Sequence, residues 1–387
     1  MTQAPENLKY WLALKFVEGL GNIGVRNLLR SFGTPERIFR SPLNMLSTVE
    51  GIGPKTASSI KDFNDWARVA TEIERVERGR VTLITCQDPR FPKRLLFIYD
   101  CPFLLYVKGA LPAGELNIAV VGSRSASAYG KFTTERLSRE LALQGAVVVS
   151  GMARGIDTAA HQGALSVQGK TIAVLGSGID VIYPPENEGL YHKIADCGAV
   201  ITEFAMGTPP NAPNFPARNR IISGISLGVV VVEATDKSGS LITARIALEQ
   251  GREVFAVPGG IDAAGSRGTN RLIKEGAKLV ENVDDILDEI RPQVAGEFEA
   301  APAADDDLPA ETPQGDNRQS HGKSGPSPVL SAGEQLLVSK LSSQPRHVDE
   351  LIAATGMAAA EILALLLQLE LRGLIRRTAG NKYILQE

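Results

Sequence analysis

Cysteine and long apolar runs are both scarce in this chain. Its 387 residues include three cysteines, Cys86, Cys101 and Cys197, without C-x-x-C spacing or a nearby histidine, so we interpret them as reduced thiols in packing roles. No apolar run approaches the ~20 residues that a membrane helix needs. The first residues lack the basic and apolar regions of a secretion signal. These absences predict a cytoplasmic protein without a membrane segment, a metal site or a cofactor.

Two common nucleotide-binding signatures are missing as well. The G-x-G-x-x-G turn of nicotinamide-dependent oxidoreductases is broken at Gly122-Ser123-Arg124-Ser125, and Gly176-Ser177-Gly178 lacks the third glycine. The G-x-x-x-x-G-K-[ST] motif of Walker-type ATPases does not occur. The sequence therefore disfavours both classes of enzyme.

Excess positive charge is absent from the chain as a whole. The net charge is −3, which taken alone argues against a nucleic-acid partner. However, residues 1–114 contain 16 Lys and Arg against 11 Asp and Glu, whereas residues 293–330 contain 2 against 7. The acidity is concentrated in one stretch, so a polyanion would be held by a local patch and not by a global field.

Length and composition divide the chain into four parts. A chain of 387 residues is too long for one ordinary core. We assign residues 1–80 to a small helical domain of the helix-hairpin-helix or SAM-like type, and residues 81–292 to an α/β domain. Residues 293–330 mix Pro, Ala, Gly, Ser and acidic residues with almost no aliphatics, which predicts a disordered linker. Residues 331–387 form the last domain.

Two glycine turns interrupt the predicted helices of the amino-terminal part. These turns, Gly19–Gly24 and Gly51–Lys55, precede helices predicted over residues 25–32 and 56–63. The amides of such a hairpin and of the next helix N-terminus can hold a DNA phosphate, and Lys55 would add a charge-assisted contact. A plain helical connection that ends in glycine is the alternative.

Four short apolar runs between residues 117 and 270 each end in a small-residue turn. The turns begin with Gly122, Ser150, Gly176 and Pro258. A buried parallel strand that leads into a glycine turn and then a helix presents free backbone N–H groups to an anion. Repetition of this unit predicts a Rossmann-like, doubly wound and mostly parallel sheet, with a ligand crevice at the carboxyl ends of its strands. We expect the ligand to be phosphorylated.

Candidate binding residues follow the predicted strands. Arg124 stands where a crevice ligand would lie, and its guanidinium can grip a phosphate bidentately. Phe215, in a segment expected just before a helix, could stack on a base while Arg218 and Arg220 meet the backbone. Salt bridges from these two arginines to Glu203 or Glu233 are the alternative. The candidate DNA-binding set is Gly122, Ser123, Arg124, Ser150, Gly151, Phe215, Arg218, Asn219, Arg220, Ser238, Gly239 and Lys55.

An acid and a histidine after the second predicted strand suggest catalysis at first sight. Asp157 is expected to cap a helix, with His161 one turn further along the same face. However, the sequence places no Ser or Cys nucleophile beside them. We therefore expect both residues to be structural and assign no catalytic residue.

The tail has the element order of a winged-helix domain. Three helical patterns precede the segments 374–377 and 382–385, which bracket Ala379-Gly380-Asn381, a hairpin signal. The expected recognition helix, residues 358–372, is rich in Ala and Leu and offers few side chains that read bases. This pattern favours protein contact, or a degenerate domain, over sequence-specific DNA reading.

Several motifs of the central part occur together in one known family. They are Gly122-Ser123-Arg124, Ser150-Gly151 through Ala160-His161, Tyr183-Pro184-x-x-Asn187, Phe215-Pro216-x-Arg218-Asn219-Arg220 and Ser238-Gly239-Ser240-Leu241. In order and spacing they resemble those of the bacterial DprA/Smf (DNA-processing protein A) family, densely over residues 117–280. One departure is Pro185-Glu186, where some members carry a basic residue.

The resemblance implies a function as well as a fold. Members are non-enzymatic homodimers that bind and protect single-stranded DNA without sequence specificity. They promote loading of the RecA recombinase during natural transformation and recombination, and act against a coat of single-strand-binding protein. The resemblance also implies that Arg124, Arg218, Asn219 and Arg220 form the strand-binding pocket of this chain.

The main alternative is a nucleotide-hydrolysing enzyme of the LOG, lysine-decarboxylase-like group. That group uses Pro-Gly-Gly-x-Gly-Thr followed by a glutamate. Here Pro258-Gly259-Gly260 is separated from Gly268-Thr269, and Asn270 stands where the glutamate is expected. The missing acid disfavours hydrolysis.

Overall fold

The computed structural model describes residues 8–113 and 116–299, together with short segments between residues 340 and 385. The chain divides into two compact units, Met1–Ala303 and Ala304–Glu387. Among the described helices, none has the length and apolar character that crossing a bilayer requires.

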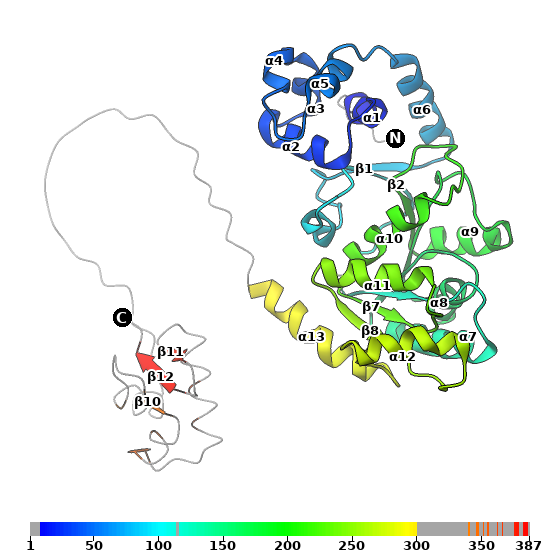
Figure 1. Cartoon of the computed structure of the whole chain (residues 1–387), viewed down its shortest axis with the longest axis vertical. Coiled ribbons are helices and arrows are strands. Elements are labelled where there is room, and N and C mark those ends of the chain that lie inside the picture. The colour runs from blue at the N-terminus through cyan, green and yellow to red at the C-terminus, as the bar shows by residue number, and fades with distance from the viewer. Residues whose placement is uncertain are drawn as a thin grey trace, which may run out of the picture. The chain divides into compact units, whose positions relative to one another are not determined.

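The described residues before position 81 are helical, as predicted. The helices are α1 (Leu8–Phe16), α2 (Asn22–Phe32), α3 (Pro35–Arg40), α4 (Leu43–Leu46), α5 (Pro54–Lys61) and α6 (Trp66–Arg78), drawn in blue in Figure 1. Fully buried leucine and isoleucine side chains, such as Leu12, Leu28 and Ile60, hold them together. The two glycine turns lie side by side, since a Cβ on Gly24 would lie 3.1 Å from Ile52 Cδ1. Asn27 Nδ2 of α2 also donates to the Glu50 carbonyl at 3.0 Å.

Nine described strands form one sheet. They are β1 (Thr82–Thr85), β2 (Leu104–Gly109), β3 (Asn117–Val121), β4 (Val147–Ser150), β5 (Thr171–Val174), β6 (Ala199–Thr202), β7 (Gly228–Val231), β8 (Glu253–Ala256) and β9 (Lys278–Leu279). Their order is β1-β2-β6-β5-β4-β3-β7-β8-β9. The strands from β3 onward are parallel to their neighbours, whereas β2 pairs antiparallel with β6 and β1 with β2. This topology confirms the doubly wound, mostly parallel sheet.

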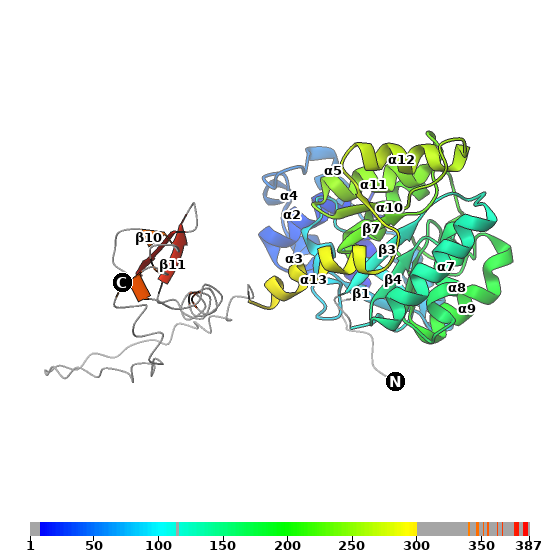
Figure 2. The same ribbon diagram turned by 90° about the horizontal axis from the view of Figure 1, so that it is seen from below.

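Helices cover both faces of the sheet, as Figures 1 and 2 show. They are α7 (Ala128–Leu143), α8 (Ile156–Leu165), α9 (Glu188–Cys197), α10 (Asn214–Ile225), α11 (Gly239–Glu249), α12 (Arg267–Lys274) and α13 (Asp284–Glu299). Short 3-10 turns are η1 (Lys93–Phe97), η2 (Pro185–Asn187) and η3 (Ala264–Ser266). Residues from α10, α11 and α12 share one apolar core with the sheet, and residues from α7, α8 and α13 share another. Burial on both faces explains why the central strands are almost entirely Val, Ile and Ala.

A third core joins the helical part to the sheet. It includes Trp11 and Leu12 of α1, Tyr106 of β2 and Met206 after β6. The Trp11 and Phe103 rings stack with centroids 6.4 Å apart. Glu72 of α6, which is buried, accepts hydrogen bonds from the Tyr106 hydroxyl at 2.7 Å and the Met206 amide at 2.8 Å. The helical part is therefore packed onto the α/β part through apolar and polar contacts.

One boundary prediction needs correction. Helix α13 continues to Glu299, so residues 293–299 are helical and do not belong to the predicted disordered linker. The apolar side chains of Ile286, Leu287 and Ile290 anchor the first turns of this helix on the sheet, and the helical hydrogen bonding continues beyond them. The remainder of the predicted linker, residues 300–330, lies outside the described residues.

The predicted hairpin of the tail is confirmed. Strand β11 (Ile375–Thr378) pairs antiparallel with β12 (Lys382–Leu385), and β10 (Arg346–His347) pairs with the other edge of β12. A three-stranded sheet of this kind is the wing of a winged-helix domain. Most of the predicted recognition helix, residues 358–372, lies outside the described residues.

Candidate nucleic-acid interface

A large cleft at the sheet lies where the strand order reverses. Strand β3 has β4 on one side and β7 on the other, so the connections after β3 and β7 depart in opposite directions. At this topological switch point a doubly wound sheet opens a crevice at the carboxyl ends of its strands. The cleft has a volume of about 680 Å³. Its walls are the turn after β3, the start of α8, the segment before α10 and the first turns of α10 and α11.

The turn after β3 is fixed by its neighbours. Gly155 has a φ of 77°, which favours glycine, and a Cβ at this position would collide with the backbone oxygens of Ser123 and Arg124. The Ile156 amide donates to the Ser123 carbonyl at 3.1 Å. Further along, Ser127 caps α7 by accepting from the Gly130 amide at 3.0 Å. Arg124 is thus presented from a turn that is held at both ends.

Glu233 is the residue that holds the second end of this turn. Its buried carboxylate, just after β7, accepts from the Ser127 amide at 2.9 Å and from the Ser127 hydroxyl. From the sequence, Glu233 was expected only as a possible salt-bridge partner of Arg218 or Arg220. No sequence signal connects Ser127 and Glu233, because the contact depends on β3 and β7 being neighbours.

An exposed arginine faces an aromatic pair across the cleft. The Arg124 guanidinium carbon lies 5.0 Å from the centroid of the Phe215 ring, within the range of a cation–π contact. The Tyr183 ring lies beside Phe215, with centroids 5.8 Å apart. Among the described residues Arg124 forms no ion pair, so its charge is available to a ligand. Tyr183 was not in the predicted set, although it belongs to a quoted motif.

Arg218 forms the floor of the cleft and is only 3% exposed. Its Nη1 donates to the carbonyls of Gly151, at 2.7 Å, and Val174, and its Nε donates to Asn219 Oδ1 at 3.2 Å. These contacts fix the guanidinium plane and leave Nη2 without a hydrogen bond among the described residues. Burial lowers the pKa of Arg218 to about 10, so the group stays charged at neutral pH.

Gly151 and Asp157 surround the free end of Arg218. A Cβ on Gly151 would lie 2.6 Å from Arg218 Nη2 and 2.7 Å from Asp157 Oδ2, so glycine leaves the space in which these two groups approach each other. Burial raises the pKa of Asp157, while the Arg218 charge acts in the opposite direction. The prediction that Asp157 caps α8 is wrong, because Gly155 occupies the N-cap position. Asp157 Oδ2 instead accepts a hydrogen bond from the Ala153 amide at 3.3 Å.

The first turn of α11 supplies the remaining polar wall. Ser238 is the N-cap residue, without a side-chain capping bond, and Gly239 and Ser240 follow it along the cleft. Ser240 Oγ donates to Ser238 Oγ at 3.0 Å. The free amides of a helix N-terminus, with the helix dipole behind them, favour an anion.

The structure brings most of the predicted site residues together, but not all. Gly122, Ser123, Arg124, Phe215, Arg218, Asn219, Ser238 and Gly239 line the cleft. Gly151 lies beneath it. Ser150 is fully buried and donates to the Val120 carbonyl at 2.7 Å, so its hydroxyl points into the sheet. Lys55 is exposed at the start of α5, in the helical part.

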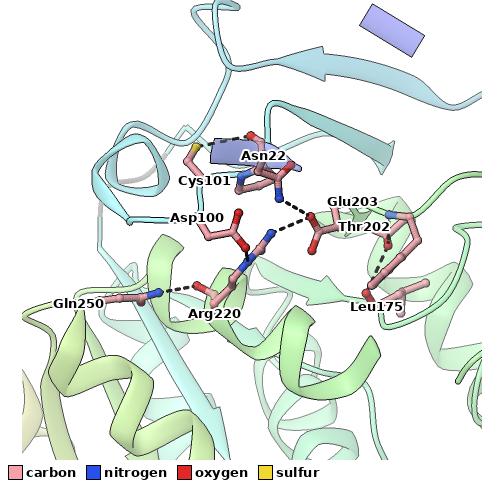
Figure 3. A network of polar contacts seen from close by, with 10 residues as sticks. Asn22, Asp100, Cys101, Leu175, Thr202, Glu203, Arg220 and Gln250 are labelled. Carbon is pink, nitrogen blue, oxygen red and sulfur yellow. Dashed lines mark hydrogen bonds and ion pairs between the residues drawn. The ribbon is translucent and has the colours of Figure 1, made fainter. Parts of the chain in front are cut away.

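Arg220 lies on a different side of α10. Its Nε donates to Asp100 at 3.0 Å and its Nη2 to Glu203 at 2.7 Å. Figure 3 shows this network, in which Asn22 of α2 also reaches Glu203, at 3.2 Å. The ion pair to Glu203 is the alternative that the sequence left open. The segment Phe215–Arg220 was expected just before a helix, yet α10 begins at Asn214, and a helix turns residues 218 and 220 to different faces.

Asp157 and His161 show no catalytic arrangement. His161 is fully buried, and its Nδ1 lies 2.7 Å from Thr171 Oγ1. Burial lowers the pKa of His161 to about 3, so the ring is neutral at physiological pH. Within the described residues, no group of three or more His, Cys, Asp or Glu side chains is placed to hold a metal ion.

Next to Ala153, which lines the cleft, Arg154 forms an ion pair with an acidic side chain. Glu186 in η2 accepts two hydrogen bonds from Arg154, one of them at 3.2 Å, and both side chains are exposed. The Arg154 guanidinium keeps the pKa of Glu186 below its usual range. This is the position at which the sequence departs from a basic residue.

The fold and the cleft define a Rossmann-like α/β protein with a cleft at the topological switch point of its sheet. A family model described as DNA recombination-mediator protein A matches residues 82–291, and a model of the DprA winged helix domain matches residues 321–381. The chain belongs to the DprA/Smf family of DNA-processing proteins.

Individual relatives agree with this assignment. Protein Smf of Synechocystis sp. is 33% identical over 396 residues, which covers 97% of this chain and 98% of that protein. The X-ray structure of DNA processing protein A from Streptococcus pneumoniae has a TM-score of 0.63 and 38% identity, covering 73% of this chain and 98% of that one. DNA processing protein A from Helicobacter pylori, which is described with a single-stranded DNA binding mode, has a TM-score of 0.50 and 31% identity, covering 55% and 97%.

Proposed function

We propose that the protein binds single-stranded DNA in the switch-point cleft, without sequence specificity. The observation that carries the proposal is the Arg124 guanidinium, which has no ion-pair partner in the part of the chain that the structure describes and lies 5.0 Å from the centroid of the Phe215 ring. A phosphate would lie between Arg124 and the amides of Ser238 and Gly239, and a base would stack on Phe215. The single-stranded DNA binding described for the Helicobacter pylori relative supports this choice of ligand.

The absence of sequence specificity follows from the chemistry of the walls. Phosphate contacts carry no sequence information, and every base has a face that can stack on an aromatic ring. Asn219 is the cleft side chain best able to read a base edge, and its Oδ1 already accepts from Arg218 at 3.2 Å.

The wider role that we propose rests on family membership. The protein would protect bound strands and promote loading of the RecA recombinase during natural transformation and recombination, displacing single-strand-binding protein. It would act in the cytoplasm as a homodimer, with the winged-helix domain in protein contact. The family description as a recombination mediator supports this proposal.

We propose no catalytic role. The position that bears a glutamate in the LOG group is Asn270, whose side chain both donates to and accepts from the Gly259 backbone, at 3.0 and 3.2 Å. An amide held in this way cannot act as the acid or base of a hydrolase. A hydrolysis assay on nucleoside monophosphates tests the alternative, and turnover there would overturn the assignment.

Fluorescence anisotropy with a labelled single strand tests the binding proposal. We expect salt-sensitive binding that unlabelled duplex competes for poorly. Arg124→Ala should weaken binding to all base compositions alike and reduce the salt slope by about 1. Arg139→Ala, an exposed arginine on α7, is the matched control and should bind like the wild type. Equal affinity for duplex, or indifference to Arg124, would contradict the proposal.

A further inference from the structure

A second hollow adjoins the cleft on the outer side of α10. Its volume is about 580 Å³, and its lining includes Phe97, Tyr99, Arg26, Pro216 and Ile246. Pro216 also lines the switch-point cleft, so the two spaces meet at the first turn of α10. Asp100, Arg220 and Gln250, which Figure 3 labels, form its inner wall.

Two aromatic rings on the rim of this hollow project into solvent. Phe97 is 84% exposed and Tyr99 75% exposed. Their neighbours Leu95 and Ile98 are buried, and both lie close to Gly224 of α10. The backbone between the rings is therefore anchored, and it holds both rings outward. The Arg26 guanidinium carbon lies 5.8 Å from the centroid of the Tyr99 ring, and Tyr99 remains 75% exposed. A contiguous patch of large exposed apolar side chains is typical of a binding surface, whereas a single exposed apolar side chain is not.

An apolar path joins the aromatic rim to the cleft. Ile242 lines the cleft and Ile246 lines the hollow, one turn further along α11. The two helices that carry Pro216 and these isoleucines both begin at the cleft and pack against each other. Helix α11 spans 11 residues, or about 16 Å, so the rim lies within a few nucleotides of the cleft.

The charges of the hollow favour bases over phosphates. Its arginines, Arg26 and Arg220, are accompanied by two carboxylates, Asp100 and Glu249. Arg220 is already paired, with Asp100 and with Glu203. A wall with balanced charge attracts a phosphate weakly, whereas exposed aromatic faces stack on any base.

We propose that the hollow is a second subsite for the same DNA strand, in which Phe97 and Tyr99 stack on bases that leave the cleft along Ile242 and Ile246. The inference rests on the proposed function, because it needs a strand in the cleft. The second subsite would contact the bases of the strand, while the phosphates of the same nucleotides face solvent. It also sets the direction of the strand's path, toward η1 and α2.

Anisotropy with a short and a long oligo-thymidine, of about 5 and about 20 nucleotides, separates the two subsites. We expect Phe97→Ala/Tyr99→Ala to weaken binding of the long strand about tenfold or more, since stacking contributes about 1–3 kcal/mol per base. The short strand should bind as it does to the wild type. The salt slope should not change, because no phosphate contact is removed. Phe132→Ala, an exposed ring on α7, is the control.

A long oligonucleotide with abasic positions outside a central segment gives a second test. The wild type should bind the abasic strand more weakly than the intact strand. The double variant should bind the abasic strand with the same affinity as the wild type does. Unchanged affinity of the double variant for the intact strand would overturn the inference and leave the proposed function standing. If the variant bound DNA normally but failed in recombinase-dependent strand exchange, the rim would be a protein-docking surface, which also overturns it. Failure of the wild type to bind single strands would overturn the proposed function itself.

Discussion

Arg218 and Arg220 stand two positions apart on α10, yet their guanidinium groups serve different sides of the helix. Arg218 Nη1 donates to the Gly151 carbonyl at 2.7 Å beneath the cleft, whereas Arg220 Nη2 donates to Glu203 at 2.7 Å at the junction with the helical part. The two arginines of one motif therefore have different surroundings, one at the cleft and one between parts of the protein.

We expect substitutions of the two arginines to have different effects. Arg220→Ala should destabilise the protein by about 3 kcal/mol, because Glu203, only 10% exposed at its side chain, loses its ionic partner. The affinity of the folded protein for a short strand should change little. Arg218→Lys keeps a charge but loses the fork of donors, so it should weaken short-strand binding about tenfold or more. Thermal unfolding and anisotropy on both variants check this, and a large loss of short-strand affinity in folded Arg220→Ala would contradict it.

Gly151→Ala should disturb Arg218 without touching the ligand. The added methyl group would lie 2.6 Å from Arg218 Nη2, so the guanidinium must move, at a cost of about 1–3 kcal/mol in stability. Strand affinity should fall together with the melting temperature. The control is Gly189→Ala on α9, where no atom lies within 4 Å of the new Cβ and alanine suits the helix better. Equal behaviour of the two variants would show that Arg218 does not depend on this space.

Removing the charge of Glu186 should strengthen DNA binding. Arg154, which follows Ala153 of the cleft, donates two hydrogen bonds to Glu186, so Glu186→Gln would free an exposed guanidinium for a phosphate. We expect an affinity gain of several-fold at low salt and a salt slope steeper by about 1. The double variant Arg154→Gln/Glu186→Gln should lose this gain. A gain that persists in the double variant would mean that Glu186 repels the strand directly.

The pH dependence of stability should contain a contribution from His161. Its pKa is lowered to about 3 by burial, below the ordinary value near 6.5. The unfolded chain therefore binds the proton more readily, and stability is full above pH 6.5 and decreases as the pH falls from 6.5 toward 3. His161→Gln should flatten this part of the profile of unfolding free energy against pH. A profile that keeps the same slope in His161→Gln would contradict this prediction.

Sequence patterns predicted the parts of this fold that follow from local rules. Each apolar run that ended in Gly122, Ser150 or Pro258 is a buried parallel strand, because a strand covered on both faces must be apolar throughout. Since parallel strands share one carboxyl edge, a crevice was correctly expected at that edge. The contact of Ser127 with Glu233 could not be predicted, because it depends on which strands are neighbours.

The start of α10 shows why the site was predicted only in part. Pro216 and the prolines before it suggested a loop, but proline is tolerated in the first turn of a helix, where its missing N–H costs nothing. Because the segment was expected to be a loop, Arg218 and Arg220 were both expected to contact the same ligand. In the helix that the structure shows, the two residues lie about 200° apart around the axis.

The core shared by the helical part and the sheet has a consequence for how the molecule melts. A cut near residue 80 would expose Trp11 and Tyr106 and leave the Glu72 carboxylate without its hydroxyl and amide donors. The helical part and the α/β part are therefore expected to unfold together, as one cooperative unit. Calorimetry should record a single transition for residues 8–299, and neither fragment should fold to full stability when it is expressed without the other.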